Sequence, residues 1–329
     1  MTKSVRIDLT LALIALLCAI LSLGIGPAHL GWGRSFAALV GQGDDVATTI
    51  VWQLRLPRAL LALLIGAMLG GAGAALQGYL RNPLADPGVL GTSSTAALGA
   101  VLALYYGFAA ISPLTLPIFA IAGALVGLIP LLLLAARSEG PLALILAGVA
   151  IATAAGAGIS LALNFAPNPF AAVEIMTWLM GSLADRSFLH VWLALPCIGL
   201  GLGLILLEGR ALDALTLGEE GATALGVDLR RTRLVLLIAT AIGVGGAVAV
   251  SGAIGFVGLV VPHLVRSFTD RRPSSLLIPS ALGGAALLAA ADALVRSVQT
   301  LEEPRLGVVT ALIGVPVFLH QLMRARRQW

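Results

Sequence analysis

Two arginines stand three residues apart at the start of an apolar segment, in the stretch RLPRALLALL that covers residues 55–64. At this spacing Arg55 and Arg58 share one face of a helix, and Pro57 between them suits a first helical turn. A guanidinium stays charged and binds a carboxylate through two parallel hydrogen bonds. For a pair of outer arginines the residues alone favour snorkelling towards lipid headgroups, with a surface that receives acidic groups as the alternative.

A third arginine, Arg296, ends another apolar segment one helical turn after Asp292. This spacing would allow Asp292 to hold Arg296 within its own helix. A carboxylate inside an apolar segment is also the kind of group that couples an ion gradient to transport. Because Asp292 lies near the end of its segment, an ion-coupled secondary transporter is the less favoured alternative.

No other set of residues has the spacing needed for catalysis or metal binding. The single lysine, Lys3, cannot supply the internal Gly-Lys-Ser/Thr of a P-loop. The four histidines show no metal-ligand spacing, and neither HExxH nor a nucleophile–base pair occurs. Cys18 and Cys197 lie in apolar runs and are predicted to be buried free thiols. We expect a chain that is not an enzyme and binds no metal or cofactor of its own.

The composition requires a membrane. The 329 residues are 59% hydrophobic and 11% charged, whereas soluble domains carry about 25% charged residues. Apolar runs of about 20 residues, long enough to cross a bilayer, recur throughout. They predict an all-α polytopic protein with about ten transmembrane helices, at roughly 9–26, 54–80, 90–107, 115–136, 142–165, 188–207, 233–252, 257–269, 275–297 and 308–324. The GAMLG stretch at 66–70 has the GxxxG spacing of close helix packing.

An even number of spans puts both termini on one side of the membrane. With that side cytoplasmic, most of the 20 basic residues fall in cytoplasmic segments, as the positive-inside rule requires. The outer basic residues are then Arg34, Arg55, Arg58, Arg186, Arg296 and Arg305. Because basic residues are scattered over short loops, nucleic acid is not an expected partner, whereas lipid is.

An internal repeat is visible at an offset of 175 residues. RALLALLIGAMLGGAGA from Arg58 resembles RLVLLIATAIGVGGAVA from Arg233, and Pro87 aligns with Pro262. Five spans separate the two starts, so the copies have opposite orientations, as in many transporters. We expect one permease domain, 1–329, divided into a first helix and outer loop (1–53), a first repeat (54–165), an outer helix with the sixth span and a cytoplasmic segment (166–232), and a second repeat (233–329).

The stretch RNPLADPGVLGTSS, residues 81–94, breaks the helix between the second and third spans. Pro83 and Pro87 lack the amide donor that a helix needs and restrict the residues before them. Asn82 and Asp86 can supply the missing hydrogen bonds, so these four residues predict a structural loop. A tight turn and a direct place in the transport pathway are equally compatible with the sequence.

Several motifs in order identify a family resemblance. RLPRALLALLIGAMLGGAGAALQGYLRNPLADPGVLG, GEEGATALGVDLRRTR, GAIGFVGLVVPHLVR and GVVTALIGVPVFL resemble the FecCD/BtuC family, the permease subunits of ABC importers for iron chelates, haem and cobalamin. The resemblance covers about residues 50–325. It implies a homodimer in the bacterial inner membrane, two cytoplasmic ATPase subunits that bind ATP and Mg²⁺, and a periplasmic binding protein that delivers the substrate.

The resemblance also implies roles for individual residues. Arg55, Arg58 and Arg296 match the family arginines that receive glutamates from the binding protein, and 168–187 would lie beneath that protein. In the segment 216–228 the resemblance implies a coupling helix on the ATPase, oriented by Glu219 and Glu220; its small apolar face comprises Ala222, Leu225, Gly226 and Val227. A cytoplasmic gate is expected at Gly140 and Pro141, and a weakly polar pathway is lined by Thr153, Ser160, Asn164 and Thr310.

One stretch departs from the family pattern. Where the family has a Glu-Leu-Pro-like turn before the Gly-Val-Val-Thr helix, this chain has Glu303-Pro304-Arg305, which displaces the proline and adds a charge. The local geometry is therefore not predicted by the resemblance. For the substrate, family frequency favours a ferric siderophore, with haem and cobalamin as alternatives.

Overall fold

The computed structural model describes residues 3–26, 28, 30–135, 141–298 and 303–326, and no strand occurs in this part of the chain. The long helices are α1 (Lys3–Gly24), α4 (Leu56–Tyr79), α5 (Thr92–Tyr105), α6 (Thr115–Ala135), α7 (Pro141–Asn164), α9 (Phe188–Leu207), α12 (Leu229–Ser251), α13 (Val257–Arg266), α14 (Pro273–Ser297) and α15 (Leu306–Arg326). The remaining ones are α2 (Trp32–Leu39), α3 (Asp45–Thr49), η1 (Ile50–Arg55), η2 (Pro87–Leu90), η3 (Phe108–Ala110), α8 (Pro169–Leu179), α10 (Gly209–Ala214), η4 (Leu215–Leu217) and α11 (Glu219–Ala224).

Each of the ten predicted spans contains one of the long helices, which confirms the all-α polytopic fold. In the described residues, seven helices are long and apolar enough to cross a membrane. The other three predicted spans correspond to the shorter apolar helices α5, α13 and α15. The second span begins earlier than predicted, because α3, η1 and α4 form one continuous helical segment, Asp45–Tyr79.

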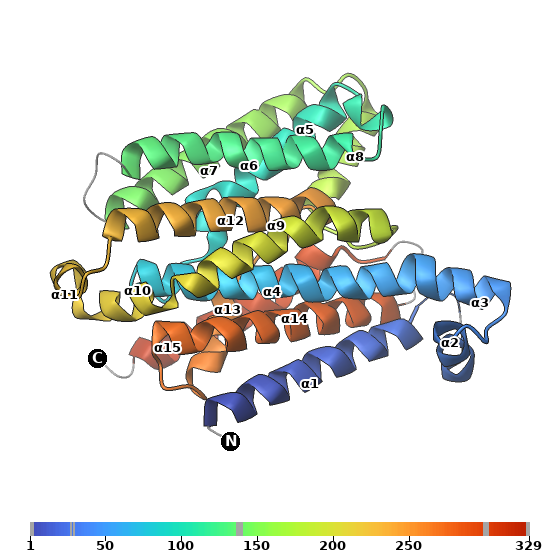
Figure 1. Ribbon diagram of the computed structural model, residues 1–329. Coiled ribbons are helices and arrows are strands. Elements are labelled where there is room, and N and C mark those ends of the chain that lie inside the picture. The colour runs from blue at the N-terminus through green and yellow to red at the C-terminus, as the bar shows by residue number, and fades with distance from the viewer. Residues whose placement is uncertain (1–2, 27, 29, 136–140, 299–302, 327–329) are drawn as a thin grey trace.

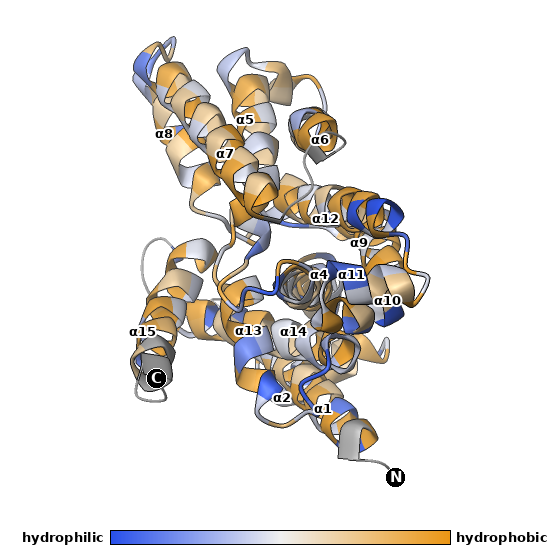
Figure 2. Ribbon diagram, turned by 90° about the vertical axis from the view of Figure 1, so that its left-hand side faces the viewer, coloured by the Kyte–Doolittle hydropathy of each residue, from blue (hydrophilic) through white to orange (hydrophobic). Residues whose placement is uncertain are grey.

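Helix α4 runs through the middle of the bundle (Figures 1 and 2). Helices α5, α6, α7 and α8 form a group on one side of it, and α13, α14, α15 and α1 lie on the other. In the most apolar stretch of α4 most residues are buried, and the same holds for α12, whereas less than a third of that stretch is buried in α1, α7 and α9. The exposed helices present apolar side chains outward, as a chain in lipid requires.

The predicted repeat has a counterpart in the packing. The first helix of each half packs on the third helix of the other half, α4 on α14 and α12 on α6. The second helices exchange in the same way, since α13 packs on α4 and α5 packs on α12. Helices α4 and α12 run in opposite directions along the bundle (Figure 1). The two halves therefore interlock reciprocally, as an inverted repeat would.

Small residues bring α4 and α14 into backbone contact. A Cβ atom on Gly70 would collide with the carbonyl oxygen of Ser280, and one on Gly284 would collide with the carbonyl oxygen of Gly66. The GxxxG spacing at 66–70 thus marks the helix face that meets α14. In lipid there is no hydrophobic effect to drive apolar helices together. Close approach of this kind stabilises the helix pair through van der Waals contact instead.

The bundle has two distinct ends. Helices α2, α3 and α8 lie at one, which we call the α3 end, and α11 lies at the other, the α11 end, where α1 begins and α15 finishes (Figure 1). Seen from the α11 end, hydrophilic residues gather in α11 and the start of α12 (Figure 2). The described portions of the two terminal helices therefore place both chain ends on the same side as α11.

Candidate functional site

At the α3 end, one arginine joins two helices and the segment that leads into α15. Arg58 Nε donates to Oδ1 of Asp292 over 2.8 Å, and Nη1 donates to Oε2 of Glu303 over 2.8 Å. Asp292 has no exposed surface and Arg58 is 7% exposed. Removing either charge from such a buried pair would leave the other uncompensated. Arg58 therefore ties α4 to α14.

Arg296 belongs to the same cluster through a serine of α1. Its Nη1 donates to Oγ of Ser22 over 2.9 Å, and that hydroxyl donates to Oδ2 of Asp292 over 3.4 Å. The sequence alternative in which Asp292 holds Arg296 directly is thus replaced by a bridge through Ser22. The direct hydrogen bond of Asp292 goes to Arg58, in another helix.

Arg55 reaches the connection between α1 and α2. It donates to the carbonyl oxygens of Leu23 and Ala28, over 2.7 and 2.6 Å, and to Oγ of Ser35 over 3.4 Å. These acceptors are neutral, and Arg55 is 3% exposed.

The helix type changes just before these arginines. Arg55 ends the π-helix η1, and α4 begins directly afterwards with Pro57 in its first turn. A π-turn bonds residue i to i+5, and the amide of Leu56 donates to the carbonyl oxygen of Val51 in this way. The wide turn also accommodates Pro57, which has no amide to donate within the continuous helical segment.

The three arginines thus converge from different sides on one buried region. Both Arg55 and Arg296 border Gly26, where a Cβ atom would meet their Nη2 atoms. All three side chains are largely buried within the subunit. Their assignment as receptors of a partner's glutamates stays a prediction.

The loop after α4 is held by the side chains expected to hold it. Oδ1 of Asn82 accepts from the amide of Leu84 over 2.9 Å, and Oδ1 of Asp86 accepts from the amide of Gly88 over 2.8 Å. Burial raises the pKa of the Asp86 carboxyl, against the opposing effect of the Gly88 amide. Pro87 is buried, whereas Pro83 is exposed.

A buried glutamine fastens this loop to the second half of the chain. Nε2 of Gln77 lies 3.3 Å from the carbonyl oxygens of Ala85, Gly258 and Leu259. The loop is therefore packed inside the protein rather than exposed to lipid, as non-helical backbone at membrane depth must be.

At the α11 end, only part of the predicted apolar face is accessible. Ala222 is fully buried within the subunit, while Leu225 is 65% exposed. Gly226 has a positive φ of 83°, with open space around its Cβ position. Val227 and Glu219 are half-buried, and Glu220 is exposed. Ala222 therefore anchors α11 to the subunit instead of belonging to its free surface.

Two polar contacts attach the chain around α10 to the long helices, and the sequence did not indicate either of them. Asp213 in α10 accepts from the amide and the hydroxyl of Ser274, over 2.9 and 2.6 Å, at the start of α14. Glu208 accepts from the hydroxyl of Thr232 in α12 over 2.7 Å. Nothing in the local sequence pairs these residues, because they are 61 and 24 positions apart.

The predicted pathway residues divide into two environments. Thr153, Ser160 and Asn164 are exposed on α7, and their spacing of seven and four places them on one helix face. Thr310 is 4% exposed, and its hydroxyl donates to the carbonyl oxygen of Gly307 over 3.0 Å. In this conformation Thr310 faces the protein interior. Of the predicted gate, Pro141 begins α7 and Gly140 lies outside the described residues.

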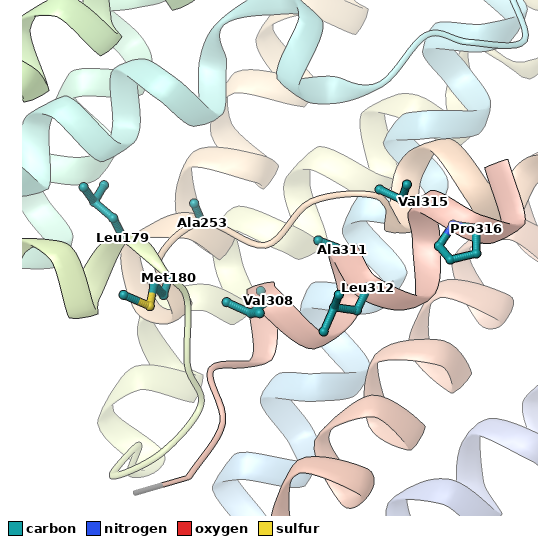
Figure 3. Close-up of a pocket in the computed structure, with 9 residues that line it drawn as sticks. Leu179, Met180, Ala253, Val308, Ala311, Leu312, Val315 and Pro316 are labelled. Carbon is teal, nitrogen blue, oxygen red and sulfur yellow. The ribbon is translucent and has the colours of Figure 1, made fainter. Parts of the chain in front are cut away.

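An open apolar groove of about 530 Å³ runs beside α15. Val308, Ala311 and Leu312 line it from α15, opposite Met180 and Ala253 (Figure 3). Leu312 is 69% exposed. The groove carries no ionisable side chain among its lining residues, so it offers shape and apolar surface instead of specific polar recognition.

Among the described residues, no group of three or more His, Cys, Asp or Glu side chains could hold a metal ion. The fold and these sites define a class of protein. It is a polytopic helical membrane protein in which charged or polar side chains connect the elements at both ends of the bundle. Residues 13–324 match the FecCD transport family, and the chain belongs to this family of ABC importer permeases.

Named relatives match over almost the entire chain. The ABC transporter permease YvrB of Bacillus subtilis (strain 168) is 42% identical over 301 residues, which cover 90% of this chain and 85% of that protein. The vitamin B12 import system permease BtuC of Salmonella typhi is 39% identical over 328 residues, covering 99% of this chain and 97% of its own.

A solved structure described as a metal-chelate type ABC transporter in an inward-facing conformation shares the fold. Its TM-score is 0.85 with 32% sequence identity, and the match covers 97% of this chain and 99% of that one. PsaBC from Streptococcus pneumoniae matches with a TM-score of 0.52 at 16% identity, which shows likeness of fold alone. Members of this family are transport subunits, and their ATPase is a separate chain.

Proposed function

We propose that this chain forms a homodimer in the bacterial inner membrane and moves a metal chelate inward, driven by two ATPase subunits and fed by a periplasmic binding protein. The family match over residues 13–324 carries the proposal. The single lysine supports the division of labour, because the chain has no P-loop to hold ATP and Mg²⁺ itself.

The proposed orientation puts the α11 end in the cytoplasm, with both termini. The support is the charge bias: Arg81, Arg210, Arg230, Arg231 and Arg271 all belong to the segments at that end. Cytoplasmic loops favour basic residues. The α3 end then faces the periplasm.

The binding protein docks at the α3 end in this proposal. Arg55, Arg58 and Arg296 provide the positive charge, which sets steering and register more than affinity. Helix α8 adds an apolar surface, since Phe170 and Val173 are 85% and 54% exposed. Aromatic and apolar side chains beside a charged cluster are typical of a protein interface.

The ATPase contact lies at the α11 end. Leu225 and Leu217 are 65% and 69% exposed there, although α11 itself is anchored by Ala222. Two exposed leucines on a short, anchored element suit insertion into a partner's groove. The attachments from Asp213 to α14 and from Glu208 to α12 give a mechanical connection to the long helices.

The translocation pathway lies between the two subunits in this proposal, lined by the polar face of α7 and by α15. Weakly polar and apolar walls bind no substrate tightly, so selection is left to the binding protein. The gate at Gly140 and Pro141 closes this pathway on the cytoplasmic side.

Ferric siderophores are the first proposed substrate class, and the relationship to the BtuC permeases makes cobalamin the second. The test is uptake by reconstituted vesicles that contain the permease, its ATPase and its binding protein, with ferric siderophore, haem and cobalamin supplied separately. ATP-dependent accumulation of one of them supports the proposal. Accumulation of none, with active ATPase and loaded binding protein, contradicts it.

A further inference from the structure

Among the described residues, the cluster at the α3 end holds more positive than negative charge. Three guanidinium groups, from Arg55, Arg58 and Arg296, meet two carboxylates, from Asp292 and Glu303. In the part of the chain that the structure describes, the hydrogen bonds of Arg55 go to neutral acceptors. In a region this poorly exposed, an excess charge is costly. A further carboxylate brought in by a partner would therefore be attracted to the cluster.

The two carboxylates are held very differently. Asp292 sits within α14, has no exposed surface, and contacts both Arg58 and Ser22. Glu303 lies in non-helical chain before α15, and its side chain is 26% exposed. Only Glu303 can leave Arg58 without disturbing a long helix.

Glu303 also belongs to the stretch where the sequence departs from the family pattern. Its carboxylate accepts a hydrogen bond from Nη1 of Arg58, while the carboxylate of Asp292 accepts one from Nε of the same guanidinium. Nη1 is therefore one donor of Arg58 that an approaching acidic side chain could use, and Glu303 occupies it from within the chain.

We propose that Glu303 is an exchangeable internal counter-ion, which a carboxylate of the docking binding protein displaces from Arg58. The proposal rests on docking at the α3 end, as proposed above. In the undocked subunit Glu303 neutralises Arg58 and keeps the cluster folded. On docking, the partner's carboxylate takes Nη1, and Glu303 turns to solvent through its exposed side.

Competition of this kind lowers the affinity of docking. Each binding event must break the Arg58–Glu303 pair, so a part of the new ion pair's free energy is offset. The weaker affinity favours release of the binding protein after delivery, and therefore turnover. Removing the Glu303 charge should tighten docking without creating any new contact.

The test measures the Kd of the importer's purified binding protein for the complete permease–ATPase complex in lipid nanodiscs. Glu303→Gln removes the charge and keeps the shape, and we expect Kd to fall about two- to five-fold, the range of a partly exposed ion pair. Asp45→Asn, which removes an exposed carboxylate at the same end, should leave Kd unchanged. In an Arg58→Lys background, which still neutralises Asp292, the effect of Glu303→Gln should largely disappear.

Unchanged or weaker docking by Glu303→Gln would overturn the exchange, as would an equal tightening by Asp45→Asn. If the wild-type complex still docks, either result contradicts only the exchange, and the proposed docking site at the α3 end is unaffected. Absence of wild-type docking, or docking insensitive to Arg55→Gln and Arg58→Lys alike, would instead overturn the docking site itself and the exchange with it.

Discussion

Arg58 Nε and Asp292 Oδ1 lie 2.8 Å apart, although 234 residues separate them in the chain. The pair connects the first helix of one repeat to the third helix of the other, which also meet through close backbone contacts. Helices α4 and α14 are therefore joined by charge at the α3 end and by backbone contact along their length. We expect them to move as one unit during transport.

Breaking this pair should destabilise the subunit. Arg58→Ala leaves the fully buried Asp292 without its main counter-ion, and loss of one partner of a buried pair costs about 3–5 kcal/mol. Thermal loss of monodisperse protein in detergent measures the effect. Arg34→Ala, which removes a partner from an exposed ion pair with Asp44, is the control and should change little. Equal melting of the two variants would contradict the account.

Adding a methyl group between α4 and α14 should also be costly. In Gly70→Ala the new Cβ atom meets the backbone of Ser280, which cannot move aside cheaply, and we expect a loss of about 1–3 kcal/mol. Gly199→Ala places the same group on α9 with nothing within 4 Å and gains helix propensity. A lower melting temperature for the first variant alone supports the close contact, and equal effects refute it.

Charge on the exposed leucine of the α11 end should uncouple transport. Leu225→Asp puts a carboxylate on the surface proposed to enter the ATPase, whereas Leu225→Met keeps an apolar side chain there. We expect Leu225→Asp to reduce ATP-driven uptake about ten-fold or more, because burying one charge in the contact is costly. Leu225→Met should retain uptake. Gly226 is less suitable for this test, because its positive φ strains any side chain. Wild-type uptake by Leu225→Asp would contradict the proposed contact.

Acid should loosen the α2–α3 region through Asp44. Hydrogen bonds from the Ala47 amide and the Arg34 guanidinium lower the pKa of the Asp44 carboxyl below its ordinary 3.8. The stability that the carboxylate adds is therefore full above 3.8 and is lost as the pH falls through the lowered folded-state pKa. The protection of the Ala47 amide against hydrogen exchange, relative to its intrinsic rate at each pH, should fall in that range. Asp44→Asn keeps an acceptor for the Ala47 amide at the start of α3 but has no carboxyl group to titrate, so this variant should show no such step.

The ten spans could be predicted from the sequence because hydropathy alone determines them. The repeat was visible for a similar reason, since the motifs GGAGA and GGAVA and the two prolines keep one offset. The loop at 81–91 was predictable from its prolines and its Asx residues, which bond to their own backbone. The spans and the loop depend on residues close together in the chain, and the repeat on the order of residues within each copy.

The candidate sites were harder to predict because they depend on distant residues. No local pattern shows that Asp292 meets Arg58, that Ser22 bridges to Arg296, or that Ala222 turns inward. Charge within an apolar run was the one available signal, and it marked Asp292 correctly as unusual.

In the proposed function, this chain conducts substrate only when a separate ATPase hydrolyses ATP. The most direct measurement is the uptake of a loaded binding protein's substrate into vesicles that contain the permease and its ATPase, with and without internal ATP, and with a protonophore. The account predicts uptake that requires ATP and the binding protein and is indifferent to the protonophore. Uptake that persists without ATP and collapses with the protonophore would contradict it.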